Sequence, residues 1–362
     1  MGKFNKRFWC AGVLALCLGW LALPAAASDS GTDTTIWPRL AKGMTLTDDT
    51  RPEVRKWARY YAHRPRALEG MMIRARPYFW HIVQAVDTRG MPLEIALLPA
   101  VESGFKAGAR SPQQAQGIWQ FMPATARLYG LRENASYDAR QDPLASTDAA
   151  LHYLQGLHAR YGDWLLALAA YNAGEVRVTE AMHQGGTNDF WTLDLPQETR
   201  AHVARLLGLA LAIREPHRYR LRLPRIPDRP VTDAVRLDTP INLAQTAKAA
   251  GLPLNAVTCY NPGLKNIADT SSRKTLLLLP SDAARLREQL ARQAFAPGRN
   301  LATAAAVAAV PVKHVHIVRA GENLWGLARR YQTSVRQLRE WNELETVSLL
   351  KPGQKLRIAA LQ

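Results

Sequence analysis

Cysteine is scarce, and the few that occur leave no room for a framework of disulfide bonds. The chain has 3 cysteines in 362 residues, and Cys10 and Cys17 stand close to the N-terminus. Removal of that segment on export would leave Cys259 alone, so no intrachain disulfide could form. Because Cys259 has no histidine at a catalytic spacing, we expect it to be a small buried apolar residue.

The N-terminal hydrophobic run is too short for a membrane-spanning helix. It extends from Phe8 to Leu23, which is sixteen residues, whereas a spanning helix needs roughly 20. Three basic residues precede the run, and three alanines ending at Ala27 follow it. This order is typical of a secretory signal peptide. We therefore expect residues 1–27 to be cleaved after Ala27; a retained anchor and lipid attachment at Cys17 are the alternatives.

Acidic residues are outnumbered, since 30 Asp and Glu stand against 47 Lys and Arg and give a formal net charge of +17. A positive charge of this size first suggests that the protein binds nucleic acid. However, the basic residues are scattered, and the sequence contains no zinc-finger or RNP pattern. With an export signal in front, we expect an anionic partner in the exported compartment and no nucleic acid. The sequence also lacks metal-ligand clusters and phosphate-binding loops, so no cofactor is expected.

The stretch from Leu97 to Pro123 contains a candidate catalytic acid. Leu98 and Ile95 stand four and seven residues before Glu102, so a helix would place this carboxyl on an apolar stripe. Poor solvation would raise the pKa of the Glu102 carboxyl and suit it to act as a general acid. Pro99 should kink the helix. The alternative is that Glu102 is only a helix-end residue before Ser-Gly.

Two further segments accompany Glu-Ser-Gly-Phe at 102–105, namely Gly-Ile-Trp-Gln-Phe-Met-Pro at 117–123 and Ala-Tyr-Asn-Ala-Gly at 170–174. Together with Ser111 they resemble the soluble-lytic-transglycosylase catalytic domain, specifically the branch of membrane-bound murein transglycosylase D. The resemblance covers roughly residues 90 to 214. One departure is Gln114, where the family usually has glycine.

The resemblance implies a peptidoglycan lytic transglycosylase that acts on glycan strands of the cell wall. Glu102 would protonate the glycosidic oxygen after N-acetylmuramic acid and then, as a carboxylate, accept the proton of that sugar's C6 hydroxyl. The product would be a 1,6-anhydro end formed without water. The enzyme would work in a Gram-negative-type periplasm, with outer-membrane or wall association left open. The residues expected to hold the glycan are Ser111, Gly117, Gln120, Phe121, Met122, Tyr171 and Asn172.

Two alternatives to this enzyme stay open. A hydrolytic lysozyme would need a second carboxylate at a defined separation from the first, and the acids outside the motifs are Asp138, Asp142, Asp163 and Glu175. Each of these acids is also explicable as a helix cap or a surface residue. The other alternative is a catalytically silent scaffold that only binds the wall.

The fold class expected is mainly α, with a lysozyme-like catalytic domain at 51–214 followed by small α+β modules of βααβ order. We expect a flexible lead-in at 28–50 and early helices at 52–63 and 65–89. An extended linker rich in Arg and Pro is expected at 215–232.

Later helices of this domain have clear sequence signals. Asp142 precedes Pro143, and Asp163 precedes the apolar segment Trp164–Tyr171, so both aspartates should cap helices. A helix that is apolar on nearly every side must be buried. The last helix should turn four residues inward: Val203, Leu206, Leu207 and Ala210.

The C-terminal part contains an internal repeat. Shifting the sequence by 81 positions aligns Asn242 with Asn323 and Asn261 with Asn342 without a gap. The second unit, at 314–359, resembles a LysM module, and the first, at 233–280, is interpreted as a degenerate LysM-like unit. A helical spacer and an Ala-rich linker are expected at 281–313. LysM modules hold N-acetylglucosamine-containing glycans, which implies contacts from Gly321, Glu322, Asn323 and Leu350, whereas Pro240 and Ile241 replace the first two of these in the first unit.

Overall fold

The computed structural model describes residues 34–46, 48, 50–237, 242–265, 274–294, 314–319, 322, 324–331, 333, 335–342, 344, 350 and 353–358. The predicted signal peptide and the predicted Ala-rich segment at 301–310 lie outside these residues. Among the helices that are described, none is long and apolar enough to cross a membrane.

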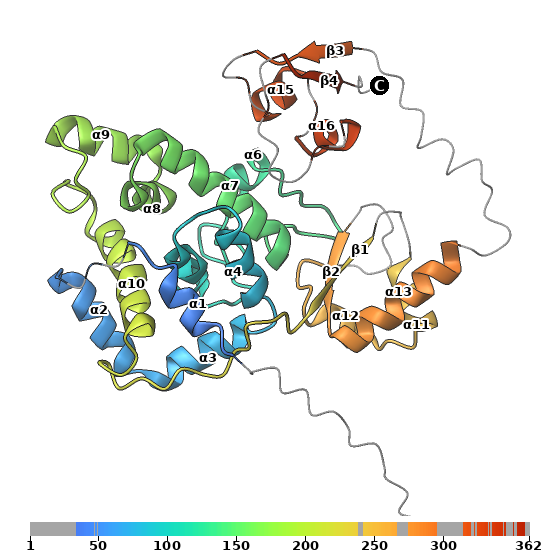
Figure 1. Cartoon of the computed structure of the whole chain (residues 1–362), viewed down its shortest axis with the longest axis horizontal. Coiled ribbons are helices and arrows are strands. Elements are labelled where there is room, and N and C mark those ends of the chain that lie inside the picture. The colour runs from blue at the N-terminus through green and yellow to red at the C-terminus, as the bar shows by residue number, and fades with distance from the viewer. Residues whose placement is uncertain are drawn as a thin grey trace, which may run out of the picture. The chain divides into compact units, whose positions relative to one another are not determined.

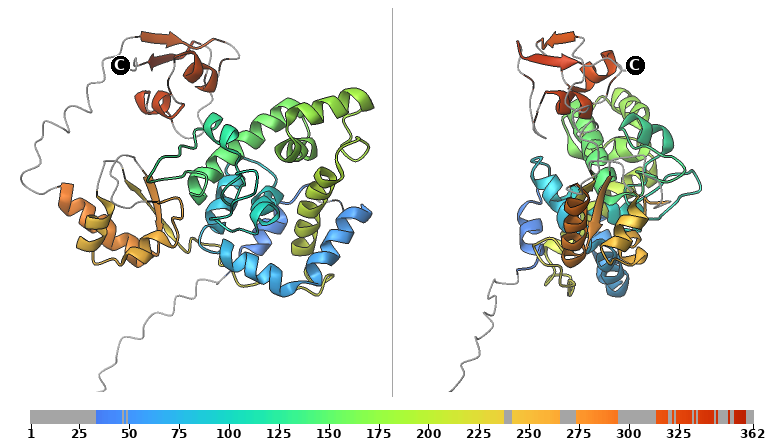
Figure 2. Two further views of the ribbon diagram at one scale, coloured as in Figure 1. Left: turned by 180° about the vertical axis from the view of Figure 1, so that it is seen from behind. Right: turned by 90° about the vertical axis from the view of Figure 1, so that its right-hand side faces the viewer.

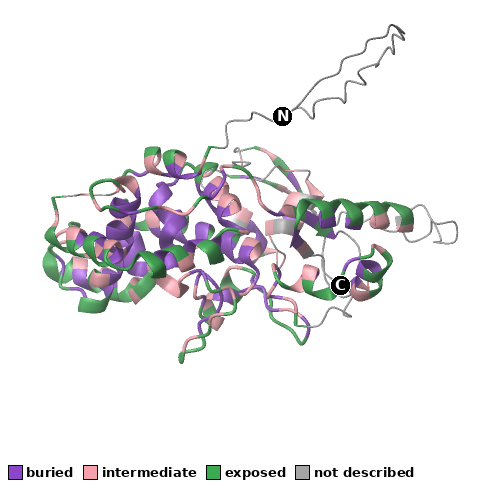
Figure 3. Ribbon diagram, turned by 90° about the horizontal axis from the view of Figure 1, so that it is seen from below, coloured by how far each residue is buried: buried purple, intermediate pink, exposed green. Residues whose placement is uncertain are grey.

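Helices form the N-terminal part of the described chain, the helical domain (Figure 1). They are α1 (Trp37–Lys42), α2 (Pro52–Ala62), α3 (Pro65–Ala75), α4 (Phe79–Asp87), the 3-10 helix η1 (Leu93–Leu97), α5 (Leu98–Ser103), α6 (Pro123–Leu128), α7 (Pro143–Tyr161), α8 (Trp164–Ala173), α9 (Glu175–Gly185) and α10 (Gln197–Arg214). Helix α10 is central, because it packs against α1, α2, α5, α8 and η1. Helices α2 and α10 lie side by side (Figure 2), and buried residues occupy the interior of this domain (Figure 3).

The predicted helix caps are confirmed. The Asp142 carboxylate accepts hydrogen bonds from the backbone N–H groups of Leu144 (2.9 Å) and Ala145 (3.0 Å) at the start of α7. The Asp163 carboxylate accepts one from the Leu166 N–H (2.9 Å) at the start of α8. These bonds satisfy N–H groups that a helix leaves without an intrahelical partner. The middle of α8 is fully buried, as its all-round apolar sequence predicts.

The segment predicted as one helix at 65–89 is two helices. It breaks between α3 and α4 at Pro77, which cannot donate to the preceding turn. The Tyr78 hydroxyl beside the break donates to the carbonyl of Phe105 (2.7 Å) and so ties this corner to the end of α5. The bend expected at Pro99 takes the form of a change from the 3-10 helix η1 to α5. Pro99 lies in the first turn of α5, where its missing N–H is tolerated.

The prediction of a flexible lead-in at 28–50 is wrong for its described part. Ile36 and Leu40 are fully buried, and α1 packs in the core of the helical domain. The buried carboxylate of Glu94 accepts hydrogen bonds from the backbone N–H groups of Thr45 (3.2 Å) and Leu46 (2.7 Å). These residues therefore extend the helical domain toward the N-terminus.

The segment predicted as an extended linker at 215–232 begins with hydrogen-bonded turns at 216–220 and packs on the helical domain. We call its residues 216–230 the strap. Leu221 and Ile226 of the strap are buried in the core of the helical domain. The Ile226 carbonyl accepts from the Ile36 N–H (2.9 Å), and the Pro224 carbonyl accepts from the Trp37 indole N–H (2.8 Å). The strap and the start of α1 thus cover each other's backbone groups.

The first LysM-like module consists of β1 (Asp233–Leu237), α11 (Leu243–Ala249), α12 (Leu254–Thr258), β2 (Lys274–Leu278) and α13 (Pro280–Ala294). Strand β1 pairs antiparallel with β2. Helix α13 is not the predicted spacer, because its Ala283 and Leu286 are buried in the module's core. Cys259, predicted to be buried, is exposed; it stands at the end of α12, beyond the face that Val257 turns inward.

The second module consists of β3 (His314–Ile317), α15 (Leu324–Arg330), α16 (Val335–Trp341) and β4 (Lys355–Ile358), and its two strands are antiparallel. The offset of 81 positions relates the first residues of all four repeated elements, which confirms the internal repeat. The side-chain N–H of Asn261 donates to the Leu277 carbonyl (2.8 Å) on β2, and that of Asn342 donates to the Arg357 carbonyl (2.9 Å) on β4. Both modules thus fasten the chain after their second helix to their second strand in the same way.

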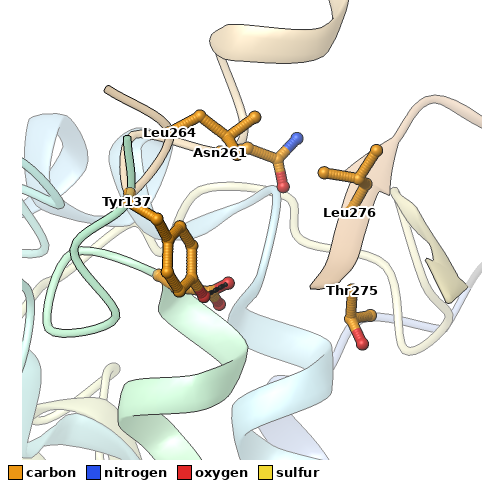
Figure 4. Close-up of a pocket in the computed structure, with 7 residues that line it drawn as sticks. Tyr137, Asn261, Leu264, Thr275 and Leu276 are labelled. Atoms are coloured by element: carbon orange, nitrogen blue, oxygen red, sulfur yellow. Dashed lines mark hydrogen bonds between the residues drawn. The ribbon is translucent and has the colours of Figure 1, made fainter. Parts of the chain in front are cut away.

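The first module meets the loop before α7 through backbone hydrogen bonds, a contact that we call the seam. The Asp138 N–H donates to the Gly263 carbonyl (2.8 Å), and the Lys265 N–H donates to the Ser136 carbonyl (2.7 Å). Residues 137 and 264 form an antiparallel β-bridge between these bonds. Figure 4 shows the pocket at the seam, with Tyr137 from the helical domain and, from the module, Asn261, Leu264, Thr275 and Leu276.

Candidate active site

Glu102 lies in the last turn of α5, and its carboxyl meets a histidine from α10. The distance from His202 Nε2 to Glu102 Oε1 is 2.9 Å. The His202 side chain is 5% exposed and the Glu102 side chain 13% exposed, so the pair lies at the edge of the core with limited access to solvent. Leu98 and Ile95, the predicted apolar stripe below Glu102, are fully buried.

Two hydroxyl groups hold the loop at 117–122 against this pair. The Ser103 Oγ next to Glu102 donates to the Ile118 carbonyl (3.0 Å). The Tyr171 hydroxyl on α8 donates to the Trp119 carbonyl (2.7 Å). The three segments recognised in the sequence therefore converge through hydrogen bonds to two successive carbonyls of one loop.

The conformation of this loop depends on a glycine and on a left-handed glutamine. Gly117 has φ 81°, and a Cβ there would lie 1.8 Å from the Arg140 carbonyl oxygen, so only glycine fits. Gln120 has φ 49°, and its side-chain amide donates to the Gly117 carbonyl (2.8 Å). Positive φ at a residue with a side chain stores strain that is often found at functional sites.

The predicted glycan-binding residues of these segments differ in exposure. Met122 is 43% exposed and Asn172 is exposed, so both offer surface to a ligand. Phe121 is buried, and its ring centroid lies 6.5 Å from that of Tyr171. Burial and the nearby charge of Glu102 raise the pKa of Tyr171 well above its ordinary value. The Tyr171 hydroxyl is therefore a neutral donor that lies close to the Glu102 carboxyl.

Ser111 forms hydrogen bonds within its own turn. Its Oγ accepts from the Ala115 N–H (3.1 Å), and its carbonyl accepts from the Gln114 N–H (3.0 Å). Gln114 stands where the family usually has glycine and nevertheless has φ 70°. The turn thus has the left-handed backbone that glycine adopts easily, although a side chain makes this conformation sterically unfavourable. A contact between Ser111 and the glycan stays a prediction.

The four acids considered for a second catalytic carboxylate each have a structural partner. Asp142 caps α7 and accepts from the Tyr137 hydroxyl (2.6 Å), and its burial raises the pKa of its carboxyl. Asp138 pairs with Arg140 (2.8 Å); burial opposes ionisation there, but the hydrogen bonds and charge of Arg140 lower the pKa of Asp138 overall. The other two are engaged as well: Asp163 caps α8, and Glu175 pairs with Arg160 (2.8 Å).

The predicted glycan contacts of the second module are only partly described. Gly321 and Asn323 lie outside the described residues, and Leu350 packs at the edge of the module's core. The Glu322 carboxylate accepts from the Arg319 N–H (2.9 Å) and lies 2.6 Å from His316 Nε2. These two hydrogen bonds, in that order, lower the pKa of Glu322 to about 2. The carboxylate is therefore built into the module, and its contact with glycan stays a prediction.

His202 is the functional candidate that the sequence motifs miss. It stands directly before Val203 and four positions before Leu206, two residues predicted to face inward. A titratable side chain on the buried face of a helix is a signal that could have identified it. Its partner is 100 positions away in the sequence, and no local pattern names that partner.

This fold and this arrangement of motifs are those of a lytic transglycosylase that carries LysM-type modules. The family model "Transglycosylase SLT domain" matches residues 82–193, and the model "LysM domain" matches residues 316–359. Residues 231–294 match the model "Lytic transglycosylase MltD, LysM-like domain", a range that includes α13. The predicted fold class, a mainly α catalytic domain followed by small LysM-type modules, is confirmed.

The relatives narrow the class to one family. Membrane-bound lytic murein transglycosylase D of Escherichia coli (strain K12) is 36% identical over 344 residues, which cover 92% of this chain and 75% of that protein. The chain belongs to the family of membrane-bound lytic murein transglycosylase D. Among solved structures, an inactive mutant of the lytic transglycosylase Slt from Pseudomonas aeruginosa is 28% identical, with 40% of this chain and 25% of that chain covered and a TM-score of 0.32.

Proposed function

We propose that this lytic murein transglycosylase cleaves the β-1,4 bond between N-acetylmuramic acid and N-acetylglucosamine in peptidoglycan and leaves 1,6-anhydro ends. The observation that carries the proposal is the convergence of three motifs on one carboxyl. Glu102 stands next to Ser103, which donates to the Ile118 carbonyl of the loop at 117–122, and the Tyr171 hydroxyl donates to the Trp119 carbonyl of the same loop. The four acids that could have served a hydrolytic mechanism are engaged elsewhere.

One carboxyl is sufficient if the nucleophile belongs to the sugar. Glu102 gives its proton to the glycosidic oxygen as the bond from that oxygen to C1 of N-acetylmuramic acid breaks. The carboxylate then accepts the proton of the C6 hydroxyl of the same sugar while the C6 oxygen bonds to C1. One group thus acts as general acid and then as general base. No water is consumed, and the carboxyl returns to its starting state.

The glycan is held by the loop and by the ends of the neighbouring helices. Gln120 and Met122 on the loop and Asn172 on α8 have side chains with solvent exposure, and they are suited to contact the sugars and the acetamido group. Holding C6 close to C1 supplies much of the catalysis, since correct placement alone can lower the barrier by about 7 kcal/mol or more. The second module would add affinity for N-acetylglucosamine-containing glycan.

The placement in the cell and the domain boundaries are part of this proposal. A signal peptide at 1–27 would deliver the enzyme to the periplasm of a Gram-negative cell, with outer-membrane association as an option, and remodelling of the wall would be its role. The contacts described above support a helical domain that includes α1 and the strap, from about residue 34 to 230. They also support a first module that ends with α13 at Ala294.

Mass spectrometry of the products released from purified sacculi tests the proposal. Anhydro-muropeptides, which are lighter than their reducing counterparts by one water, are expected. Reducing ends alone would show a hydrolytic lysozyme instead. The matched variant is Glu102→Gln, which keeps the side-chain shape but cannot transfer the proton. Unchanged product release by E102Q would remove Glu102 from the chemistry, and a wild-type protein that bound sacculi without releasing product would be a scaffold.

A further inference from the structure

The pair formed by Glu102 and His202 goes beyond what the three motifs require. Its two residues come from α5 and α10, and α10 packs against α1, α2, α5, α8 and η1 in the helical domain. A hydrogen bond from this central helix fixes one oxygen of the carboxyl. Ser103 meanwhile fixes the neighbouring loop through the Ile118 carbonyl. The Glu102 carboxyl and the backbone of the loop at 117–122 are therefore held by two different hydrogen bonds.

The ring of His202 has one partner only among the described residues. Its Nε2 faces Glu102, whereas its Nδ1 is buried and has no hydrogen-bond partner. A proton on Nδ1 would leave a buried N–H unpaired, which is costly, and buried N–H groups without partners are rare. The geometry therefore favours the tautomer with the ring hydrogen on Nε2. In that tautomer, Nε2–H donates to Glu102 Oε1.

We propose that His202 is a positioning residue that donates to Glu102 Oε1 and confines proton transfer to the other carboxyl oxygen, Oε2. This inference rests on the proposed role of Glu102. The proton moves from Oε2 to the glycosidic oxygen as the C1–O bond breaks, and it returns to Oε2 from the C6 hydroxyl as the new C1–O6 bond forms. His202 keeps its own proton in both steps, so it exchanges nothing with the substrate.

A fixed carboxyl serves a mechanism in which the same oxygen must meet two different atoms in succession. Rotation of a free carboxyl would present Oε1 and Oε2 alternately and would move the acidic proton away from the glycosidic oxygen. The hydrogen bond from α10 removes this rotation before substrate arrives. Loss of the bond should therefore lower the rate of the chemical step, and should leave the binding of the glycan largely unchanged, because the glycan-holding side chains lie on the loop and on α8.

The test compares His202→Phe with His202→Gln on short soluble glycan fragments. H202F keeps a ring but removes the donor, and a misplacement of about 1 Å can cost about 100-fold in rate. We expect its kcat to fall by about 10- to 100-fold, with KM changed by less than about 2-fold. H202Q places an amide N–H close to the position of Nε2, and we expect it to recover most of the kcat.

Val203→Ala is the matched control, because Val203 is the next residue of α10 and is fully buried. V203A should lower the melting temperature by at least as much as H202F while its kcat stays at the wild-type value. Wild-type kcat in H202F would overturn the proposal, and so would an H202Q variant as slow as H202F. E102Q separates this inference from the function itself: if E102Q kept full activity, the proposed function would fail, whereas inactive E102Q with fully active H202F refutes only the role of His202.

Discussion

Replacement of Gly117 by alanine should damage the active site more than its small size suggests. The added Cβ would lie 1.8 Å from the Arg140 carbonyl oxygen, and real Cβ atoms essentially never approach closer than 3.0 Å, so the loop must move by about 1.2 Å. The Arg140 side cannot yield easily. Its backbone N–H and its guanidinium are both bonded to Asp138, at 3.0 Å and 2.8 Å.

The magnitude follows from two separate costs. The positive φ of Gly117 costs alanine about 1–2 kcal/mol, and forced repacking costs about 1–3 kcal/mol more, so the free energy of unfolding should fall by about 2–5 kcal/mol. A shift of this size at the loop that carries Gln120 should lower kcat on soluble glycan fragments by about 100-fold. Urea unfolding and initial-rate measurements on the same samples give both values.

Gly130→Ala provides the matched control. Gly130 has φ 78°, but a Cβ there would meet no atom within 4 Å. This variant should therefore pay only the backbone cost of about 1–2 kcal/mol and keep its kcat. If G117A matched G130A in both stability and rate, the close approach to Arg140 would have no functional weight, and the reasoning from the loop geometry would be refuted.

Gln114→Gly should raise the free energy of unfolding by about 0.5 kcal/mol, because relief of the left-handed strain slightly exceeds the extra entropy of glycine in the unfolded chain; urea midpoints measure this. Tyr171→Phe leaves the Trp119 carbonyl without its donor, so the free energy of unfolding should fall by about 1–3 kcal/mol, and kcat should fall as well. An unchanged melting temperature would contradict this. The lowered pKa of Glu322 contributes stability to the second module that is fully present above the ordinary value of 4.5 and is lost as pH falls toward about 2, so acid melting curves of wild type should show a loss that Glu322→Gln does not. Deletion of residues 314–362 should weaken binding to sacculi in a pelleting assay and leave turnover of short fragments intact, whereas lost turnover would make the module part of the active site.

Local signals explain what the sequence alone could predict. The caps at Asp142 and Asp163 depend on residues within three positions, and the repeat of the C-terminal modules depends on matching elements at a constant offset. The residues of the three motifs can likewise be recognised from short runs of sequence, without knowledge of the fold. The break at Pro77 also has a local signal, because proline inside a helical pattern predicts an interruption, and the expectation of a single helix at 65–89 neglects it.

Contacts between distant segments explain what the sequence could not predict. The burial of Ile36 depends on the strap, whose Ile226 carbonyl accepts its N–H, and a composition rich in Arg and Pro conceals that role. The partner of Glu102 comes from α10, and the core position of α13 depends on a sheet formed by two separated strands. Burial of this kind is decided by tertiary packing, so a residue's own neighbours in sequence do not report it.

The seam gives the two repeated modules different steric requirements at related positions. At Gly263 an added Cβ would lie 2.8 Å from the Asp138 carbonyl oxygen, so this position accepts nothing larger than glycine. The position related to it by the repeat is Leu344, which packs against the core of its own module. A chimera with the second module in the first module's place would drive a leucine into the Asp138 carbonyl. The two modules are thus not interchangeable, and a redesign that exchanges them must restore glycine at the seam.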